Sequence, residues 1–500
     1  MPANVGRGVP MPQHFPLCGV LGPSRGAQPG DLLNHVSSFF APIAALRPSA
    51  CPGLFRIVQA LDGGLCRLKL PCGELSAEQA RAIADAVDAH ASGVIEVTNR
   101  ANLQLRGVRA GHENALIERL LHAGLGPQGP FADDETNPIA RDDIRNLMVS
   151  PLAGRDPHAL FDVTPLASQI LALLQNDPRF TALSPKFALM LDGGERLAML
   201  GHPHDIWLAA VRDLDEVRFV FGLAGCPPVR TNVRERSEGP ASKALASVLP
   251  HQVPPLVNAL LHTFLDLAAP DDSRMRDVLA THGVETVLQL AQSRVDFTLA
   301  RDIRSDAWCR FPADESLRLG SHPQINTGLS YIGGQPKLGR IDVPMLKGLA
   351  QLASDVGNAT LRMTPWQGVL IPDIASENTP QALKRLESLG LAVSTSDPLT
   401  HLIACTGSQG CLKGMADTKA DALLLAARLP AHVDVHLSGC PRSCAAAHCA
   451  PWTLLAVAPA HYDLYRRDGT PGFGERVAQH LTIEQAADSL ERLTRRSFDA

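Results

Sequence analysis

The sequence lacks an apolar run long enough to cross a membrane. Its longest uncharged apolar stretches fall short of the roughly 18 residues that a transmembrane helix requires. The first residues, MPANVGRGVPMPQHFP, also lack the basic-then-apolar pattern of an export signal. We therefore expect a cytoplasmic protein with no membrane partner.

The sequence also lacks an excess of positive charge. It has 46 Lys and Arg against 51 Asp and Glu, a formal net charge of −5, whereas nucleic-acid binding usually requires a clearly basic surface. We therefore exclude a general nucleic-acid partner. Lysine is scarce, at 8 of the 46 basic residues, and the surplus of arginine reflects either compositional bias or planar recognition of carboxylates. Any anionic ligand must be bound by a local group of basic residues.

The cysteines are few but clustered. The chain has 11, an odd number, and five of them lie between Cys405 and Cys449. A chain of 500 residues with 45% hydrophobic composition is long enough for about two to four domains and does not need disulfide bonds for stability. The cluster therefore indicates metal or redox chemistry rather than a disulfide scaffold.

The first part of the chain has the composition of a disordered segment. Residues 1–30 contain six Pro and six Gly without apolar periodicity. We predict a disordered leader over residues 1–47, with ordered sequence beginning near Cys51.

One structural unit occurs twice in the sequence. The segment GELSAEQARAIADAVDAHASGVIEVT, which begins at Gly73, aligns without a gap with GRIDVPMLKGLAQLASDVGNATLRMT, which begins at Gly339. Apolar positions coincide through a predicted helix, strand, turn and strand. Chance periodicity of two amphipathic helices is the alternative. The shared helix-to-strand switch, with Thr98 aligned to Thr364, favours a duplication with a ligand at the interface of the halves.

Four of the clustered cysteines form two pairs, C-x5-C at Cys405 and Cys411 and C-x3-C at Cys440 and Cys444. Thiolates bind zinc ions or iron-sulfur clusters. Structural zinc sites favour about two to four residues between paired cysteines, whereas a cubane of four irons accepts longer spacers. We predict that these four cysteines hold an iron-sulfur cluster; a zinc site and unliganded buried thiols are the alternatives.

The cysteine pairs and the preceding repeat resemble the sulfite/nitrite reductase superfamily, whose 4Fe-4S cluster is held by cysteines in this arrangement. The segments TNRANLQLRG (98–107), RNLMVSPLAG (145–154) and SPKFALMLDGG (184–194) support the resemblance, which covers about residues 48–490. It implies an α+β and α/β fold with duplicated ferredoxin-like half-domains and two mixed α/β domains. The implied boundaries are half-domains over 48–123 and 296–395, an α/β domain over 124–295 and a cluster-binding α/β domain over 396–500.

Within that superfamily, TNRANLQLRG, MTPWQGVLIPD, and SGCPRSCA followed by HYDLYRRDGTPG are most similar to the precorrin-3B synthases. This resemblance implies an oxygen-dependent monooxygenase that hydroxylates precorrin-3A at C20 and forms a lactone in aerobic cobalamin biosynthesis. Sulfite reductases carry two lysines separated by one residue in the third segment, whereas this sequence has Lys186 but Ala188. A sirohaem-dependent sulfite or nitrite reductase is the first alternative. A non-catalytic zinc or cluster-binding module is the second.

A precorrin is a macrocycle fringed with carboxylates, so its pocket should combine apolar walls with several cationic groups. The candidates that fall on the family motifs are Arg100, Asn102, Gln104, Arg106, Arg145 and Lys186. A solvated surface position is the alternative for each of the arginines.

Dioxygen reacts poorly with closed-shell carbon without a metal or radical, and a cluster with four cysteine ligands has no open coordination site. We therefore expect a second iron, either mononuclear non-haem or sirohaem-type; in the reductases the last ligand, here Cys444, bridges cluster and sirohaem. His322, His436 and His448 lie near the relevant segments, although a structural role is more common for a single histidine. No GxGxxG motif follows a predicted strand, so we expect an external reductase or ferredoxin to supply electrons.

Overall fold

The computed structural model describes residues 51–127, 137–214, 216–230, 243–301, 307–429, 432–446, 450–468 and 472–498. The predicted leader over residues 1–47 lies outside these ranges, as do His448 and Cys449. Within these ranges, no helix combines the length and the apolar character that a membrane crossing requires.

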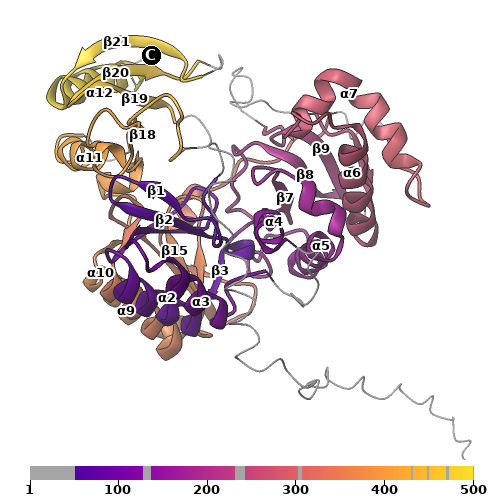
Figure 1. The fold of residues 1–500 in the computed structure, drawn as a ribbon, viewed down its shortest axis with the longest axis horizontal. Helices are drawn as coiled ribbons and strands as arrows, with labels where there is room; N and C mark the ends of the chain where they lie inside the picture. The colour runs from indigo at the N-terminus through magenta and orange to yellow at the C-terminus, as the bar shows by residue number, and fades with distance from the viewer. Residues whose placement is uncertain are drawn as a thin grey trace, which may run out of the picture. The chain divides into compact units, whose positions relative to one another are not determined.

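Two of the four main sheets form the duplicated half-domains (Figure 1). The first sheet has the order β1 (Val58–Ala60), β2 (Gly63–Leu68), β5 (Leu103–Val108), β4 (Val94–Val97) and β13 (Arg340–Ile341). The second has the order β11 (Gly320–Pro323), β12 (Leu329–Pro336), β15 (Val369–Ala375), β14 (Thr360–Met363) and β3 (Glu74–Ser76), with β16 (Leu391–Ala392) also paired to β12. The helices are α2 (Ala77–His90) and α3 (Glu113–His122) in the first half, and α9 (Val343–Val356) and α10 (Thr379–Ser388) in the second. The predicted duplicated ferredoxin-like fold is confirmed.

The sequence alignment of Gly73 with Gly339 agrees with the helix and strand boundaries of the structure. Without a gap, it carries α2 onto α9 and β4 onto β14 with no change in either boundary. The turn before each helix has left-handed backbone, with φ of 71° at Gly73 and 73° at Gly339. A Cβ at Gly73 would lie 2.5 Å from the Met363 carbonyl oxygen, so the turn requires glycine there.

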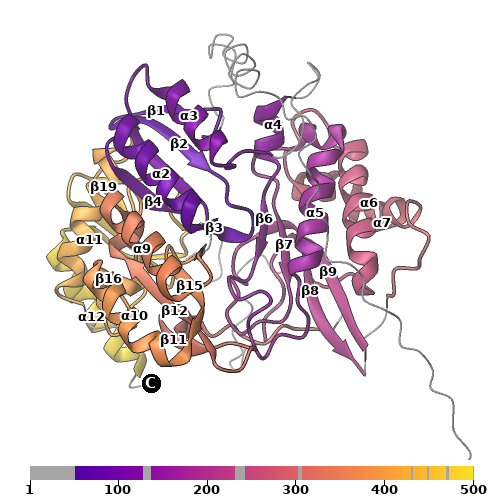
Figure 2. The same ribbon diagram turned by 90° about the horizontal axis from the view of Figure 1, so that it is seen from below.

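Helices α2 and α9 pack side by side (Figure 2). Helix α2 begins with a capping box, in which the Ser76 hydroxyl accepts from the Gln79 amide at 3.0 Å and the Gln79 side chain accepts from the Ser76 amide at 3.1 Å. Its buried face includes Ile83 and Val87. Local capping and apolar spacing therefore fix both the start of the helix and the face that it buries.

Each half donates one short strand to the sheet of the other half. Strand β3 of the first half pairs with β14, and β13 of the second half pairs with β4. An ion pair lies at each of these strand pairings. Arg340 of β13 contacts Glu96 of β4 at 3.1 Å, and Glu74 of β3 contacts Arg362 of β14 at 2.7 Å. The donated strand therefore supplies the cation in the first pair and the anion in the second. Neither half can therefore complete its sheet without the other.

The remaining two sheets share one topology, in which three neighbouring strands are parallel and two further strands are antiparallel. The first contains β6 (Leu147–Val149), β7 (Leu189–Asp192), β8 (His204–Asp213), β9 (Glu216–Gly225) and β10 (Ala246–Val248). Its core includes residues of α5 (Thr164–Asn176), α6 (Val253–Leu267) and α7 (Met275–Gln292), and α4 (Pro138–Asp143) precedes it. The second contains β17 (Leu402–Ala404), β18 (Val435–Ser438), β19 (Trp452–Ala458), β20 (His461–Arg466) and β21 (Glu475–Leu481), with α11 (Thr418–Ala426) and α12 (Ile483–Phe498).

Truncation of the exchanged strand tests the interdependence of the halves. Leu75 in β3 is fully buried opposite Leu361 of β14, so Leu75→Ala is expected to lower the free energy of unfolding by about 2–5 kcal/mol. Hydrogen exchange should show β14 losing protection together with β3. Leu61→Ala, at a position that is 54% exposed, is the control and should change little. If the loss of hydrogen-exchange protection is confined to residues 51–123, the interdependence of the two half-domains is contradicted.

Candidate active site

Cys405 and Cys440 follow the ends of two parallel strands, β17 and β18, which are neighbours in one sheet. Because the carboxyl ends of parallel strands meet at the same edge, the two cysteine loops are displayed together. The Gly439 amide donates to Cys405 Sγ at 3.2 Å, and a Cβ at Gly439 would lie 3.3 Å from that sulfur. Glycine therefore lets a backbone N–H approach the thiol, as sulfur ligands of metal clusters require.

The four predicted cluster ligands influence one another electrostatically. Burial raises the pKa of the Cys444 thiol, and the neighbouring thiols of Cys440, Cys405 and Cys411 raise it further. In the described part of the chain, no three His, Cys, Asp or Glu side chains converge on the position of a single ion. A cubane binds each thiolate at a different iron, so its ligands stand farther apart than those of one zinc ion. Four thiols on two adjacent loops are a donor set that fits such a cluster.

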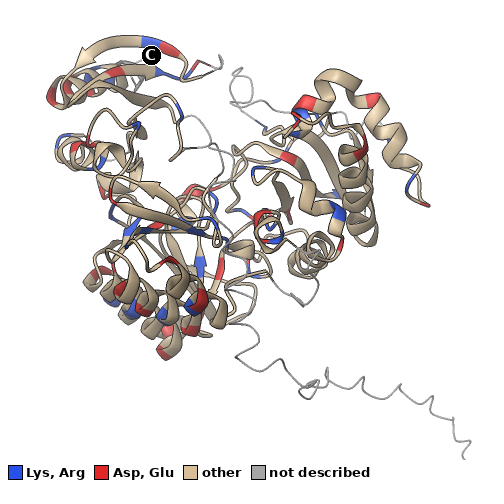
Figure 3. Ribbon diagram, in the orientation of Figure 1, with Lys and Arg blue, Asp and Glu red and all other residues tan. Residues whose placement is uncertain are grey.

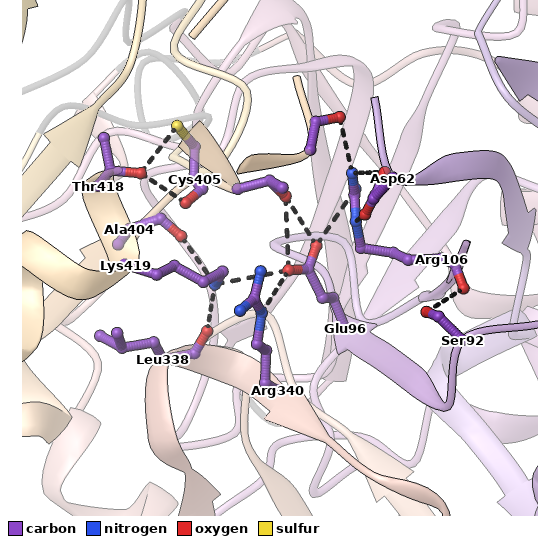
Figure 4. A network of polar contacts seen from close by, with 12 residues as sticks. Asp62, Ser92, Glu96, Arg106, Leu338, Arg340, Ala404, Cys405, Thr418 and Lys419 are labelled. Atoms are coloured by element: carbon purple, nitrogen blue, oxygen red, sulfur yellow. Dashed lines mark hydrogen bonds and ion pairs between the residues drawn. The ribbon is translucent and has the colours of Figure 1, made fainter. Parts of the chain in front are cut away.

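A buried carboxylate joins the loop that carries Cys405 and Cys411, one of the two cluster loops, to both half-domains (Figure 4). Glu96 in β4 lies 3.1 Å from Arg340 Nε and 3.7 Å from Lys419 Nζ. It also accepts from the Thr406 hydroxyl at 3.1 Å and lies 3.6 Å from Arg106 Nη1. Burial acts to raise the pKa of Glu96, but Lys419, Arg106 and Arg340 outweigh it and the pKa is lowered. The ionised carboxylate therefore ties β4 and β13 to the segment between β17 and α11.

Arg106 supports a cluster loop from inside the fold. Its side chain is almost fully buried, with Nε 2.7 Å from Asp62 Oδ2 and Nη2 donating to the Gly410 carbonyl oxygen at 3.1 Å. It is not among the residues that line the two cavities described below. The structure thus places Arg106 where it positions the loop that carries Cys411, away from the predicted contact with a tetrapyrrole.

A cavity of about 360 Å³ lies where the half-domains, the first mixed domain and the cluster loops meet. Figure 3 shows basic residues on strands at the centre of the view. Both acidic side chains of the wall, Glu96 and Asp143, already have cationic partners. The basic side chains of the wall are Arg67, Lys69, Arg100, Lys186, Lys419 and Arg442. This wall is net positive, which suits a ligand with several carboxylates.

Two predicted cluster ligands, Cys405 and Cys444, also line this cavity. A cluster held by them would therefore border the space available to a ligand. Cys51 lines the cavity as well.

Four of the six predicted tetrapyrrole-binding residues line the larger cavity: Arg100, Asn102, Gln104 and Lys186. Burial is the main cause that lowers the pKa of Arg100 to about 10. The apolar run KFALML, residues 186–191, is typical of a strand, but β7 begins only at Leu189 and Lys186 lies exposed in the preceding loop. The strand starts late because a turn precedes it, closed by the Phe187 amide donating to the Ser184 carbonyl oxygen at 2.8 Å.

Two residues that line the cavity, Arg67 and Lys69, were not among the predicted tetrapyrrole-binding residues. They alternate with the fully buried Cys66 and Leu68 along and just beyond β2. Period-two alternation puts Arg67 and Lys69 on one face of the strand and the apolar residues on the other. This pattern of two basic residues on one strand face could have marked them as candidate ligand-binding residues. Arg67 Nε is buried and has no hydrogen-bond partner among the described residues. Such an unsatisfied donor suits a ligand-binding wall.

A second cavity, of about 20 Å³, adjoins the first and shares Arg100, Asn102 and Asn146 with it. Arg145 and His204, both nearly fully buried, also line it, together with Ala188. In the described part of the structure, Arg145 Nε and His204 Nδ1 have no hydrogen-bond partner. Burial lowers the pKa of His204 to about 3, so this ring is neutral. Its lining is mixed, with apolar side chains beside the polar ones: Leu70, Leu147, Met148, Ala188 and Leu189.

The described histidines considered as iron ligands lie elsewhere. His322 Nε2 is 2.7 Å from the Leu319 carbonyl oxygen, and His436 is buried within β18. His448 falls outside the described residues. Neither described histidine lines the cavities, and their positions support no ligand for a second iron.

Comparison with known proteins decides the family. The Nitrite/Sulfite reductase ferredoxin-like half domain matches residues 59–123 and 322–389, and the Nitrite and sulphite reductase 4Fe-4S domain matches residues 140–299. The chloroplastic ferredoxin--nitrite reductase of Zea mays is 30% identical over 401 residues, which cover 76% of this chain and 67% of that protein. The chain belongs to the sulfite/nitrite reductase superfamily.

Two further relatives cover nearly the whole chain. A precorrin-3B synthase from Sinorhizobium sp is 27% identical over 463 residues, covering 92% of this chain and 91% of that protein. Among solved structures, the Mycobacterium tuberculosis NirA protein superposes with a TM-score of 0.70 at 19% identity, covering 94% of this chain and 91% of that one. The second likeness confirms the fold of the superfamily. Because the relatives are reductases and a precorrin-3B synthase, an oxidoreductase activity is supported.

Membership of the superfamily supports an iron-sulfur cluster in this chain. The matched 4Fe-4S domain over 140–299 contains Cys226 but none of the four predicted ligands. The sheet β17 to β21 repeats the topology of the sheet β6 to β10 inside that match. The four cysteines lie on loops of this second sheet, outside the matched segment.

Removal of one thiol tests the assignment. Cys440→Ser is expected to lose most of the roughly four irons and four sulfides of a cubane, because each cysteine holds one iron, and to destabilise residues 396–500, because ligation and folding are coupled. Iron and acid-labile sulfide analysis of the purified protein measures this. Cys309→Ser, at a thiol outside both cavities, is the matched control and should keep its cluster. Unchanged iron content in Cys440→Ser would count against the ligand set.

Neutralisation of Glu96 tests the buried network. Glu96→Gln leaves three cations without their shared counter-charge and is expected to cost about 3–5 kcal/mol of stability near neutral pH. Because the folded-state pKa of Glu96 lies below its ordinary value of 4.5, the carboxylate stabilises the protein above that pH and stops doing so as the pH falls through the folded-state value. Thermal unfolding from about pH 7 to pH 4 should show the gap between wild type and variant narrowing at the acid end. A gap independent of pH would contradict this.

Proposed function

We propose that this protein is an oxygen-dependent precorrin-3B synthase. It hydroxylates precorrin-3A at C20 and closes a lactone from the ring A acetate, a step of aerobic cobalamin biosynthesis. One atom of dioxygen enters the macrocycle and the other leaves as water, with two electrons and two protons supplied from outside the substrate. The similarity to the Sinorhizobium precorrin-3B synthase along nearly the whole length of both chains supports this proposal.

The small cavity is the observation that carries the proposal. Ala188 lines it at the position where sulfite reductases carry the second lysine of their anion-binding pair. The first lysine, Lys186, lines the larger cavity instead. With Ala188 in place of that second lysine, the pair of cations that would hold an oxyanion is incomplete here. The Arg145 Nε donor, which has no partner among the described residues, suits a water molecule in this space.

The lining of the larger cavity supports a tetrapyrrole ligand. Arg67, Lys69 and Arg100 would bind the carboxylates of the macrocycle, and Val97 and Leu338 give apolar wall against its ring system. When bound at the four cysteines, a 4Fe-4S cluster supplies single electrons. The same cationic wall fits sirohaem, which is also a polycarboxylate tetrapyrrole.

The electron donor is a separate protein in this proposal. The sequence has no dinucleotide fingerprint of its own, and the maize relative is named for its use of ferredoxin. A ferredoxin or a flavin reductase is therefore the class of donor that we expect.

A sirohaem-dependent nitrite or sulfite reductase is the second candidate. The 30% identity to the maize nitrite reductase favours it, as does the presence of Cys444 in the cavity wall. In this case sirohaem would occupy the larger cavity as a cofactor. The oxyanion would then be held without the second lysine of the reductases, because Ala188 stands at that position.

Isotope labelling separates the two candidates. The holoprotein is incubated with precorrin-3A, a reductant and ¹⁸O₂, and the product mass is expected to rise by one labelled oxygen atom. Nitrite or sulfite with reduced viologen should give no turnover in the same preparation. Turnover of either anion, together with an unlabelled precorrin, would overturn the proposal in favour of the reductase.

A further inference from the structure

Lys69 is a buried ammonium group without an ion pair among the described residues. It follows β2 directly, is 4% exposed and lines the larger cavity. Its Nζ donates to the Asp143 carbonyl oxygen, which is its one hydrogen bond in the described part of the structure. Because an ammonium group has three N–H donors, two are left for a ligand.

The carboxylates nearest to Lys69 are engaged by other groups. Asp143 accepts from Arg56 at 3.0 and 2.8 Å. Asp142 accepts from Arg145 at 2.6 Å and from the Leu54 amide at 3.2 Å. This corner of the cavity therefore holds more cations than anions, and a ligand carboxylate would supply the missing charge.

Burial and the neighbouring arginines disfavour the charged form of Lys69. Burial is the main cause that lowers the pKa of Lys69 to about 7, against the attraction of Asp142 and Asp143 and with the repulsion of Arg145 and Arg100. An anion beside Lys69 would stabilise the ammonium form.

We propose that Lys69 is the carboxylate anchor of the larger cavity and takes up a proton when a polycarboxylate tetrapyrrole binds. This rests on the proposed function in one respect, namely that such a tetrapyrrole occupies the cavity. The affinity for the tetrapyrrole does not change with pH where Lys69 is already charged in the free protein. Above about pH 7 the free protein must first take up a proton, so the affinity falls about tenfold per pH unit. An arginine at this position stays charged throughout and removes the dependence.

The test uses uroporphyrin, a tetrapyrrole with eight carboxylates, titrated by fluorescence into the cluster-containing protein between about pH 6 and pH 9. Wild type should bind with constant affinity at the acid end and weaken about tenfold per unit above about pH 7. Lys69→Arg should bind at every pH within about threefold of the wild type at the acid end, because the guanidinium keeps the charge. Lys69→Gln should bind about 10- to 100-fold more weakly and without pH dependence, because one charged hydrogen bond is lost.

The fold justifies glutamine as the neutral substitution, and an exposed lysine provides the control variant. The duplicated position in the second half carries Gln335, whose side chain accepts from Arg318 at 2.7 Å, so glutamine fits this place in the fold. Lys347→Gln removes an exposed lysine paired with Asp85 at 2.6 Å, outside the cavity, and should bind like wild type. If the protein is purified with sirohaem, the rate of sirohaem release over the same pH range is measured in the same variants, and the same pattern is expected.

The outcomes separate this inference from the proposed function. A wild type without pH dependence, or a Lys69→Arg variant that keeps the wild-type slope, overturns proton uptake at Lys69 and leaves the precorrin-3B synthase proposal intact. Failure of any tetrapyrrole to bind at any pH overturns both proposals. The slope in wild type, its absence in Lys69→Arg and the weak binding of Lys69→Gln together establish the anchor.

Discussion

The buried carboxylate of Glu96 is the constraint on which the site depends. It belongs to the first half-domain, yet its partners come from the exchanged strand β13, from the loop after β17 and from α11. A buried carboxylate of this kind is stable only while its cations stay in place. The position of the cluster loops relative to the cavity is therefore set by an interaction that no single segment of the chain could form. Arg106 extends the network by holding Asp62 and the loop of Cys411.

The duplication gives two equivalent faces, which differ in the residues that line them. In the second half, Trp366 replaces Arg100 and Leu370 replaces Gln104 at the duplicated positions. That face is filled by a hydrophobic cluster of Leu152, Leu197, Met199, Leu317, Tyr331, Trp366 and Leu370. The charge at the strand crossing is also reversed, since Arg362 stands where the first half has Glu96. One half therefore supplies packing for the scaffold, and the other supplies the charged wall and contacts the cysteine loops.

The sequence could predict the repeat and most of the helix and strand positions, because local periodicity and capping set them. It could not predict that β3 and β13 exchange between the halves, since pairing between segments so far apart in the chain leaves no local pattern. The same limit applies to the site. The family motifs led to Arg100 and to the cysteines, but the motif arginine Arg106 turns inward to an ion pair with Asp62. Lys69, which no motif marked, lines the cavity because of the β2 alternation and the engagement of its neighbouring carboxylates by other cations.

We infer that a cluster held by the four cysteines shares a wall with the larger cavity, formed by Cys405 and Cys444. Electron paramagnetic resonance of the reduced holoprotein, recorded with and without saturating uroporphyrin, tests this most directly. A ligand against two cluster thiolates should change hydrogen bonding and solvent exposure at the sulfurs, so we predict a shift in the g values of the cluster signal on binding. An unchanged spectrum, with bound uroporphyrin shown by its fluorescence in the same sample, would contradict a shared wall.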